Sequence, residues 1–319
     1  MLPDVRLGPT DTMLRPLGLG VWQWGDSYWS YDPTTAYENA RAAFTVSLDA
    51  GVTLIDTAEA YGKGESERTL GRLIAETGRR PFIATKFQPL PRLRPSSVAT
   101  ALEGSLERLG VDCIDLYQVH HPFSILRMEH VLGRIADAVR AGKVRHVGVS
   151  NYNERQMRKA HRLLARRGIP LVSNQVHYSL LHRAPEANGV LAACRELDIT
   201  LIAYSPLAQG ALTGKYGPGR GKVSGMRRFR RVFRHLGRAM PLVEALEEIG
   251  RVHDRTAAQV ALNWLAAQPN VIPIPGARDG RQAEENAHSI DFHLSEAEMA
   301  LLDGLTRVYR RHGRPIIDM

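Results

Sequence analysis

The feature of this sequence that most constrains its fold is a regular alternation of short apolar runs with longer amphipathic stretches. The runs are rich in β-branched residues and recur about every 30 residues, the length of one strand–helix–strand unit. Strands that alternate with single helices form parallel sheets with right-handed crossovers, and eight such units are typical of a closed barrel. Eight runs are present: LGLGVW from Leu17, TLIDTA from Thr53, PFIATK from Pro81, IDLYQVH from Ile114, VRHVGVSN from Val144, LVSNQVHY from Leu171, ITLIAYSP from Ile199 and VIPIPG from Val271.

The stretches between the runs have apolar residues at helical spacing and predict the helices of such a barrel. Several end at a glycine just before the next strand, and glycine suits the left-handed conformation with which many helices stop. These glycines are Gly51, Gly110, Gly142 and Gly168. The predicted helices include TTAYENARAAFTVSLDAG, SSVATALEGSLERLG, MEHVLGRIADAVRAG and NERQMRKAHRLLARRG.

An open, doubly wound sheet is the structural alternative for alternating strands and helices. A nucleotide-binding sheet of that kind carries a G-x-G-x-x-G loop between a strand and a helix. Here LGLG near the start continues into aromatic residues instead. We therefore predict a (β/α)8 TIM barrel that forms a single domain over residues 1–319. Around it we expect an N-terminal β-hairpin at VRLGPTDTML, which can plug the barrel bottom, and extra C-terminal helices at VEALEEIGRVHD, TAAQVALNWLAAQ and LSEAEMALLDGL.

Composition indicates an ordinary globular protein. Hydrophobic residues make up 44% of the chain and charged residues 24%, and no segment approaches the ~20 apolar residues of a membrane span. The N-terminus has no apolar stretch behind basic residues, as a secretory signal would have. Only two cysteines occur, Cys113 and Cys194. We therefore expect a cytoplasmic protein in which both remain thiols.

The net charge of +9 is concentrated in one segment. Between Pro218 and Arg238 there are eight basic residues and no acidic one, so the rest of the chain is nearly neutral. Its run MRRFRRVFRHLGR has apolar residues at helical spacing, as in basic amphipathic helices that bind membranes, partners or nucleic acid. Our first interpretation is a solvated lid over a bound cofactor. Anion capture and macromolecular binding are the alternatives, and we expect neither nucleic acid nor membrane as a partner.

Polar residues stand where most of the predicted strands end. In parallel barrels the carboxyl ends of the strands meet at one rim, where the βα loops hold catalytic groups. A lone buried aspartate or lysine is costly, but the two can pair when they share one mouth. The strand-end residues are Asp56, Lys86, His120, Ser150 with Asn151, Gln175, and Tyr204 with Ser205.

An aspartate, a lysine and a histidine in one mouth suit the reduction of a carbonyl group. That reaction needs a hydride donor and an acid that protonates the developing alkoxide. Tyr61, five residues beyond Asp56, is the candidate acid. We expect Lys86 to lower the pKa of Tyr61 and Asp56 to hold Lys86 charged. His120 would orient the carbonyl oxygen. A purely structural ion-pair network is the alternative.

The motifs together resemble the aldo-keto reductase family. GVTLIDTAEAYG, ATK, DLYQVHHP, GVSNY, SNQVHYS, LIAYSPLAQGALTGKY and IPIPGAR occur in the family's order and span the chain from about Leu17 to Leu305. This resemblance implies NADPH-dependent reduction of aldehydes or ketones to alcohols. It also implies a catalytic tetrad of Asp56, Tyr61, Lys86 and His120.

The same resemblance implies where the cofactor lies. An arginine beside a helix N-terminus suits a 2′-phosphate, which favours NADPH over NADH. NADH use stays open, because Gly276 and Ala277 stand where some relatives carry Lys and Ser. The nicotinamide would contact Ser150, Asn151, Gln175 and Tyr204, and the pyrophosphate Ser205, Leu207 and Gly210. The adenosine end would contact Gly276, Arg278, Gln282, Glu285 and Asn286.

Aromatic residues after the first strand would form one wall of the substrate pocket, and we expect an apolar or aromatic aldehyde. Trp22, Trp24, Tyr28 and Trp29 are the candidates, with His121 where many members carry an aromatic residue. No metal site is expected. Two rival functions remain: a regulatory subunit resembling the potassium-channel β subunits, which bind NADP with little turnover, and a nucleic-acid or membrane binder that uses the basic segment.

Overall fold

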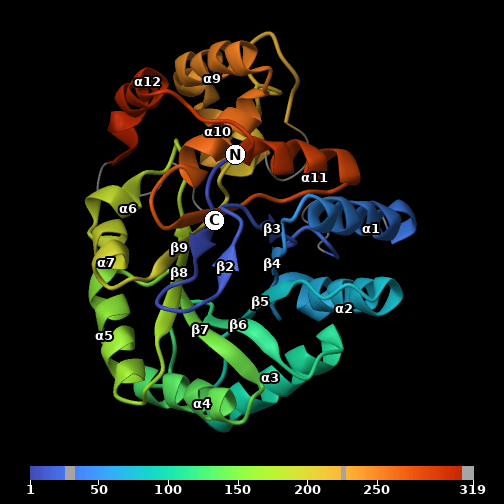
Figure 1. The fold of residues 1–319 in the computed structure, drawn as a ribbon, viewed down its shortest axis with the longest axis vertical. Helices are drawn as coiled ribbons and strands as arrows, with labels where there is room; N and C mark the ends of the chain where they lie inside the picture. Colours follow the sequence, from blue (N-terminus) through green and yellow to red (C-terminus); the bar gives the residue numbers. More distant parts are fainter. Residues whose placement is uncertain (26–32, 224–227, 311–319) are drawn as a thin grey trace.

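The computed structural model describes residues 1–25, 33–223 and 228–310, and its centre is a barrel of parallel strands (Figure 1). The 8-stranded sheet follows chain order, each strand pairing in parallel with the next. A parallel bridge between Gly20 and Gly276 closes the ring, which confirms the predicted (β/α)8 barrel. The strands are β3 (Leu19–Gly20), β4 (Leu54–Asp56), β5 (Phe82–Phe87), β6 (Ile114–Val119), β7 (Val144–Ser150), β8 (Leu171–His177), β9 (Thr200–Tyr204) and β10 (Val271–Ile274).

Helices form an outer ring around the strands (Figure 1). Gly110 ends α3 at φ 66, a left-handed conformation that costs glycine little because it has no Cβ. Gly51, Gly142 and Gly168 also have positive φ, as predicted. The helices of the ring are α1 (Pro33–Asp49), α2 (Glu65–Thr77), α3 (Ser96–Leu109), α4 (Met128–Arg140), α5 (Glu154–Ala165), α7 (Val190–Glu196) with the short α6 (Ala184–Ala187) before it, α10 (Ala257–Ala266) and α11 (Gly280–Ala287).

The N-terminal hairpin plugs the end of the barrel opposite the strands' carboxyl termini. Its strands β1 (Val5–Arg6) and β2 (Met13–Leu14) pair antiparallel. Leu7 between them is fully buried, and the backbone N–H of Gly8 donates to Thr200 Oγ1 at 2.9 Å. Both the hairpin and the plug were expected from the sequence. Leu7 and Leu14 pack on inward-facing residues of the strands: Leu54, Ala84, Leu116, Val172, Ile202, Ile272 and Ile274.

The extra helices α9 (Met240–His253) and α12 (Glu296–Thr306) lie outside the ring, as predicted (Figure 1). α10, also expected among the extra helices, instead joins β9 to β10, packs against β10 and belongs to the ring. Thr256 begins α10 with a capping box, in which its hydroxyl accepts from the Gln259 N–H while the Gln259 side chain accepts from the Thr256 N–H. Ser295 and Glu298 do the same for α12. Because a capping box satisfies backbone donors at both of its residues, these sequences set where the helices begin.

The basic segment does not form the single amphipathic helix that its spacing suggested. Apart from residues 224–227, which lie outside the described residues, it contains two short turns, α8 (Arg231–Arg234) and the 3-10 turn η5 (Leu236–Ala239). Phe233 packs edge-on against Tyr216, with ring centroids 5.8 Å apart, and Arg220 pairs with Glu247. Among the described helices, none has the length and apolar character needed to cross a bilayer.

Candidate active site

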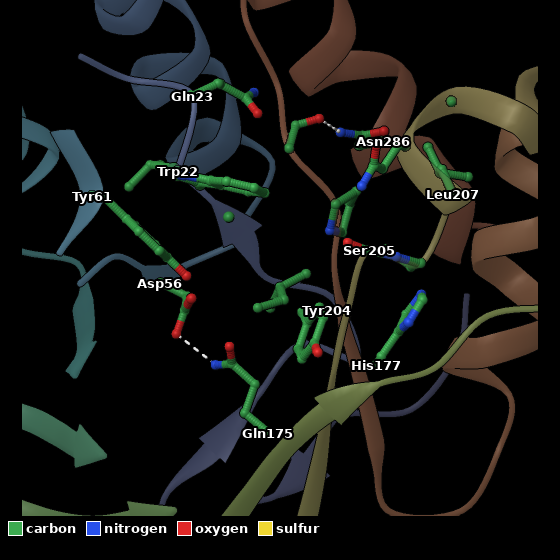
Figure 2. Close-up of a pocket in the computed structure, with 18 of the residues that line it drawn as sticks. Trp22, Gln23, Asp56, Tyr61, Gln175, His177, Tyr204, Ser205, Leu207 and Asn286 are labelled. Atoms are coloured by element: carbon green, nitrogen blue, oxygen red, sulfur yellow. Dashed lines mark hydrogen bonds between the residues drawn. The ribbon is translucent and has the colours of Figure 1, made fainter. Parts of the chain in front are cut away.

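A cavity of about 630 Å³ opens at the carboxyl ends of the barrel strands. Figure 2 shows the side chains of β4, β8 and β9 converging on it. Lys86 does not line it but lies behind Asp56, fully buried. The cavity brings together the predicted residues Trp22, Asp56, Tyr61, His120, His121, Ser150, Asn151, Gln175, Tyr204, Ser205, Leu207, Gly210, Gly276, Arg278, Gln282, Glu285 and Asn286.

Asp56 and Lys86 form a buried ion pair at the base of the cavity. Lys86 Nζ lies 2.5 Å from Asp56 Oδ1, and both side chains are almost fully shielded from solvent. Burial alone would lower the pKa of Lys86, but Asp56 and Tyr61 outweigh it, so the pKa of Lys86 is raised. The ion pair therefore keeps the Lys86 ammonium charged in an environment without solvent. This is expected, because an unpaired buried charge would destabilise the fold.

Tyr61 reaches the same ammonium from a tight turn. It begins the 3-10 turn η2 (Tyr61–Gly64), in which Gly62 and Lys63 have left-handed backbones. Lys86 Nζ donates to Tyr61 Oη at 3.1 Å, to Asp56 Oδ1, and to the Thr57 carbonyl at 2.8 Å. Because an ammonium has three hydrogens, these contacts use all of them. The phenol oxygen thus accepts from Lys86, and its own hydrogen remains available toward the cavity.

Burial raises the pKa of Tyr61, and Lys86 opposes that rise without cancelling it. The sequence-based expectation for Lys86 was correct in sign for its own contribution but wrong for the net direction. The physical reason is that a phenolate in this cavity loses much of its hydration, which one ammonium does not replace. The resting site therefore holds Tyr61 as a neutral phenol, the form that can give up a proton.

His120 is a neutral imidazole in the cavity wall. Burial, assisted by Lys86 and His121, lowers its pKa to about 2. Its ring packs edge-on to Tyr61 at 5.8 Å and stacks on His121 at 4.5 Å. Its Nδ1 is buried and has no hydrogen-bond partner among the described residues. A neutral ring beside the phenol can exchange a hydrogen bond with a carbonyl oxygen but cannot supply a proton from an imidazolium.

The amide residues of β7 and β8 are already engaged with the protein. Asn151, in a left-handed backbone conformation at φ 61, accepts from Tyr204 Oη at 3.0 Å and donates to the His120 carbonyl at 3.1 Å. Since a carbonyl can only accept, the amide orientation of Asn151 is fixed. Gln175 Nε2 donates to Asp56 Oδ2 at 2.7 Å (Figure 2). Ser150 Oγ donates to the Gln175 carbonyl at 2.9 Å.

Gln118 is a site residue that sequence reasoning missed. Its Nε2 donates to Asp56 Oδ2 at 3.2 Å from the second-last position of β6. The signal was present in DLYQVHH, because Gln118 precedes His120 by two residues and alternate residues of a strand share a face.

Three parallel rings stack at one wall of the cavity. His177 stacks on Tyr204, with centroids 5.4 Å apart, and on His182 at 4.0 Å. Burial lowers the pKa of His177 well below its usual value and that of His182 to about 4. Both imidazoles are therefore uncharged and can stack without repulsion. The motif analysis named neither histidine, although His177 is the last residue of β8 and lines the cavity; His182 follows in the next loop.

The far end of the cavity lies at the turn from β10 into α11. Asp279 caps α11 by accepting from the Gln282 N–H at 2.8 Å. Asn286 Nδ2 donates to the Gly276 carbonyl at 3.2 Å. Arg278 is exposed at the cavity edge. Lys215 also lines the cavity and adds a second cation that the motif analysis did not name.

The predicted substrate wall is only partly as expected. Trp22 lines the cavity, with its ring 5.9 Å from that of Tyr61. Trp24 does not: it is 2% exposed, packs in the core, and its indole N–H donates to the Ala277 carbonyl at 3.2 Å. The assignment of Trp24 to the substrate pocket is thus corrected. Trp22 and Trp24 lie in one tight turn, which directs Trp22 into the cavity and Trp24 into the core. Tyr28 and Trp29 lie outside the described residues.

Comparisons with known proteins agree with the fold and the order of motifs. The profile described as "Aldo/keto reductase family" matches residues 16–307. An uncharacterised oxidoreductase of Mycobacterium tuberculosis (strain ATCC 25618 / H37Rv) is 38% identical over 308 residues, covering 95% of this chain and 93% of that protein. The chloroplastic pyridoxal reductase of Arabidopsis thaliana is 36% identical, over 94% of this chain and 84% of its own.

A solved structure matches over the whole length. The aldo/keto reductase of Klebsiella pneumoniae, crystallised in complex with NADP and acetate, superposes with a TM-score of 0.78 at 27% identity, covering 100% of both chains. The parallel barrel with an Asp–Lys–Tyr cluster at its mouth is consistent with an oxidoreductase. The comparisons identify which family of barrel oxidoreductases it is. The chain belongs to the aldo/keto reductase family.

Proposed function

We propose that this protein is an NADPH-dependent reductase of aldehydes and ketones, with Tyr61 as the proton donor. One observation supports this most strongly. Lys86 donates its three ammonium hydrogens to Asp56, Thr57 and Tyr61, so the hydroxyl hydrogen of Tyr61 is free to point toward the cavity. A buried acid with a fixed ammonium behind it suits transfer of a proton to a developing alkoxide.

The residues divide the work as follows. Tyr61 donates its proton to the carbonyl oxygen, and the Lys86 ammonium at 3.1 Å stabilises the tyrosinate that forms. Asp56 keeps Lys86 charged and in place. His120, neutral at physiological pH because its pKa is about 2, orients the carbonyl oxygen by hydrogen bonding. When bound, the reduced nicotinamide supplies the hydride to the carbonyl carbon.

The residues that line the cavity fit a dinucleotide phosphate. The cavity runs from Tyr61 past Ser205 to the β10–α11 turn and offers Lys215 and Arg278 as cations. His120 Nδ1, a buried polar atom without a partner among the described residues, lies at the reactive end. Tyr204, backed by His177 at 5.4 Å, would stack on the nicotinamide, with Ser150, Asn151 and Gln175 around it. Arg278 at the other end favours NADPH over NADH, since a guanidinium binds phosphate well.

A regulatory subunit that resembles the potassium-channel β subunits is the alternative. Such a subunit would bind NADP with little turnover, whereas the ion pair and phenol here are arranged for proton transfer. We also propose a cytoplasmic location, where the free thiols of Cys113 and Cys194 persist. The basic segment from Pro218 to Arg238 serves in this proposal as a lid beside the cofactor, since Phe233 packs on the cavity residue Tyr216.

The test is NADPH oxidation by the wild-type protein and by Tyr61→Phe across aldehydes, quinones, sugars and pyridoxal. Pyridoxal belongs in the panel because one relative is named for its reduction. We expect Tyr61→Phe to lose about 100-fold or more in kcat, because it removes the acid, while NADPH affinity is kept. Full activity in Tyr61→Phe would refute the assignment of the acid. Tight NADPH binding without turnover of any carbonyl would favour the regulatory subunit.

A further inference from the structure

The carboxylate of Asp56 has three donors, and they divide between its two oxygens. Lys86 Nζ holds Oδ1 at 2.5 Å. Gln175 Nε2 at 2.7 Å and Gln118 Nε2 at 3.2 Å both donate to Oδ2. A buried carboxylate is costly unless it is paired and hydrogen-bonded, so donors to both oxygens help to keep it charged. Two amides thus share the task of satisfying one oxygen.

Gln118 is held there at a visible cost. It is fully buried, and its Oε1 has no hydrogen-bond partner among the described residues. The amide cannot flip to relieve this, because Oε1 would then face the carboxylate. Buried acceptors without partners destabilise a fold and are rare. The hydrogen bond from Nε2 to Asp56 is what this placement provides in return.

The neighbouring strand makes room for this side chain. Gly148 on β7 pairs with Gln118 on β6, and a Cβ on Gly148 would lie 2.9 Å from Gln118 Cγ and 2.3 Å from Ser173 Oγ. The backbone of Gly148 does not have a positive φ, so its glycine is explained by space and not by conformation. An alanine there would push Gln118 away from Asp56.

The two amides differ in what else they can reach. Gln175 lines the cavity, whereas Gln118 does not. In the function proposed above, Gln175 also contacts the nicotinamide, and the inference drawn here rests on that placement. Gln175 then has two partners on opposite sides, the cofactor and Asp56. Within the part of the chain that the structure describes, the side chain of Gln118 bonds to Asp56 alone.

We propose that Gln118 is a positioning residue that keeps Asp56 Oδ2 hydrogen-bonded when Gln175 turns toward the cofactor. Without Gln118, Asp56 would depend on Gln175 alone for that oxygen. Binding of the nicotinamide would then compete with the ion pair of Asp56 and Lys86. Gln118 therefore contributes to cofactor affinity without touching the cofactor, through a carboxylate that both amides share.

A double-mutant cycle tests this, because coupling between two residues appears as non-additivity. The variants are Gln118→Met, Gln175→Met and the double variant, with methionine chosen to keep the side-chain shape while removing the donor. The measurement is the dissociation constant for NADP⁺ by quenching of tryptophan fluorescence. We expect Gln118→Met to weaken binding by about fivefold in the wild-type background and to have no effect in the Gln175→Met background.

Two results would overturn the proposal: unchanged NADP⁺ affinity in Gln118→Met, or equal weakening in both backgrounds. Ser173→Ala is the matched control, since Ser173 is a buried barrel residue beside Gly148 whose Oγ has no partner among the described residues. We expect it to bind NADP⁺ as the wild type does. Gln118→Leu provides a second variant if Gln118→Met folds poorly, which far-UV circular dichroism reports.

The outcome is separable from that of the proposed function. Carbonyl reduction that depends on Tyr61, combined with an additive cycle, would leave the reductase proposal standing and remove the role of Gln118. A non-additive cycle in a protein that reduces no carbonyl would support the role of Gln118 and remove the reductase proposal. We further expect kcat to fall in Gln118→Met by more than KM for the carbonyl changes, because Asp56 positions Lys86 and not the substrate.

Discussion

Lys86 Nζ lies 3.1 Å from Tyr61 Oη and donates its hydrogen bond to the phenol oxygen. The direction of this bond matters more than its length. It leaves the phenol proton on the cavity side, and it places positive charge where negative charge develops once that proton leaves. Lys86 is fully buried and Tyr61 partly so, which limits the screening of this interaction by solvent.

Replacing Lys86 with methionine should therefore affect activity and stability together. We expect kcat to fall by about 100-fold or more, because the tyrosinate loses its ammonium. We also expect unfolding to become easier by about 3–5 kcal/mol, since Asp56 remains as an unpaired buried charge. Urea unfolding and NADPH oxidation measure the two effects.

The double variant Lys86→Met with Asp56→Asn separates these effects. Removing the second charge should restore most of the lost stability, because no unpaired ion is left in the core. Activity should stay at the level of Lys86→Met. Recovery of activity in the double variant would mean that Lys86 serves only to neutralise Asp56.

The pKa directions predict a broad pH plateau for kcat. The pKa values of Tyr61 and Lys86 are both raised, so the acid and its ammonium keep their protons until strongly alkaline pH. The pKa of His120, lowered to about 2, keeps this ring neutral on the acid side. We expect kcat to vary by less than about twofold between pH 6 and 9. A midpoint near pH 7 in that profile would show that His120 titrates during turnover.

The sequence predicts the position of a side chain well where that side chain belongs to a strand or helix, because the regular backbone fixes which way it points. The strands were predictable because runs such as ITLIAY are nearly continuous in apolar residues and rich in β-branched ones, as buried parallel strands are. Asp56 and Lys86 were predictable because a strand end fixes which rim a side chain reaches. Their pairing at 2.5 Å then follows from the cost of burying either one alone.

In turns, the sequence does not predict which way a side chain points. Trp22 and Trp24 both follow β3, yet Trp22 lines the cavity and Trp24 is in the core. Side chains have no regular periodicity outside a strand or helix. The conformation of the turn alone therefore determines which tryptophan faces the cavity. The net pKa of Tyr61 was likewise out of reach, because the depth of burial that raises it is a property of the assembled cavity.

Acid should destabilise the fold through its buried neutral histidines. Burial lowers the pKa of His182 to about 4, below the value near 6.5 in an unfolded chain. Between these values the unfolded state binds a proton that the folded state does not, so stability falls as the pH drops below about 6.5. His182→Phe keeps a ring for His177 to stack on but cannot titrate.

We expect His182→Phe to lose less stability than the wild type between pH 7 and pH 4, by on the order of 3 kcal/mol. Urea unfolding at a series of pH values measures this difference. Parallel pH curves for the two proteins would show that His182 is protonated in the folded state as readily as in the unfolded one.

Cofactor choice should depend on Arg278, which is exposed at the α11 end of the cavity. Its backbone N–H is held by the Gln282 side chain at 3.1 Å, so the residue has a defined place beside α11. If the guanidinium binds a 2′-phosphate, Arg278→Ala should weaken NADPH binding by about 10-fold to 100-fold, the worth of a charge-assisted hydrogen bond. NADH lacks that phosphate and should lose little. Arg281→Ala is the matched control, because Arg281 is an exposed arginine of α11 that does not line the cavity. Equal losses for both cofactors in Arg278→Ala would place 2′-phosphate recognition elsewhere, with Lys215 as the next residue to replace.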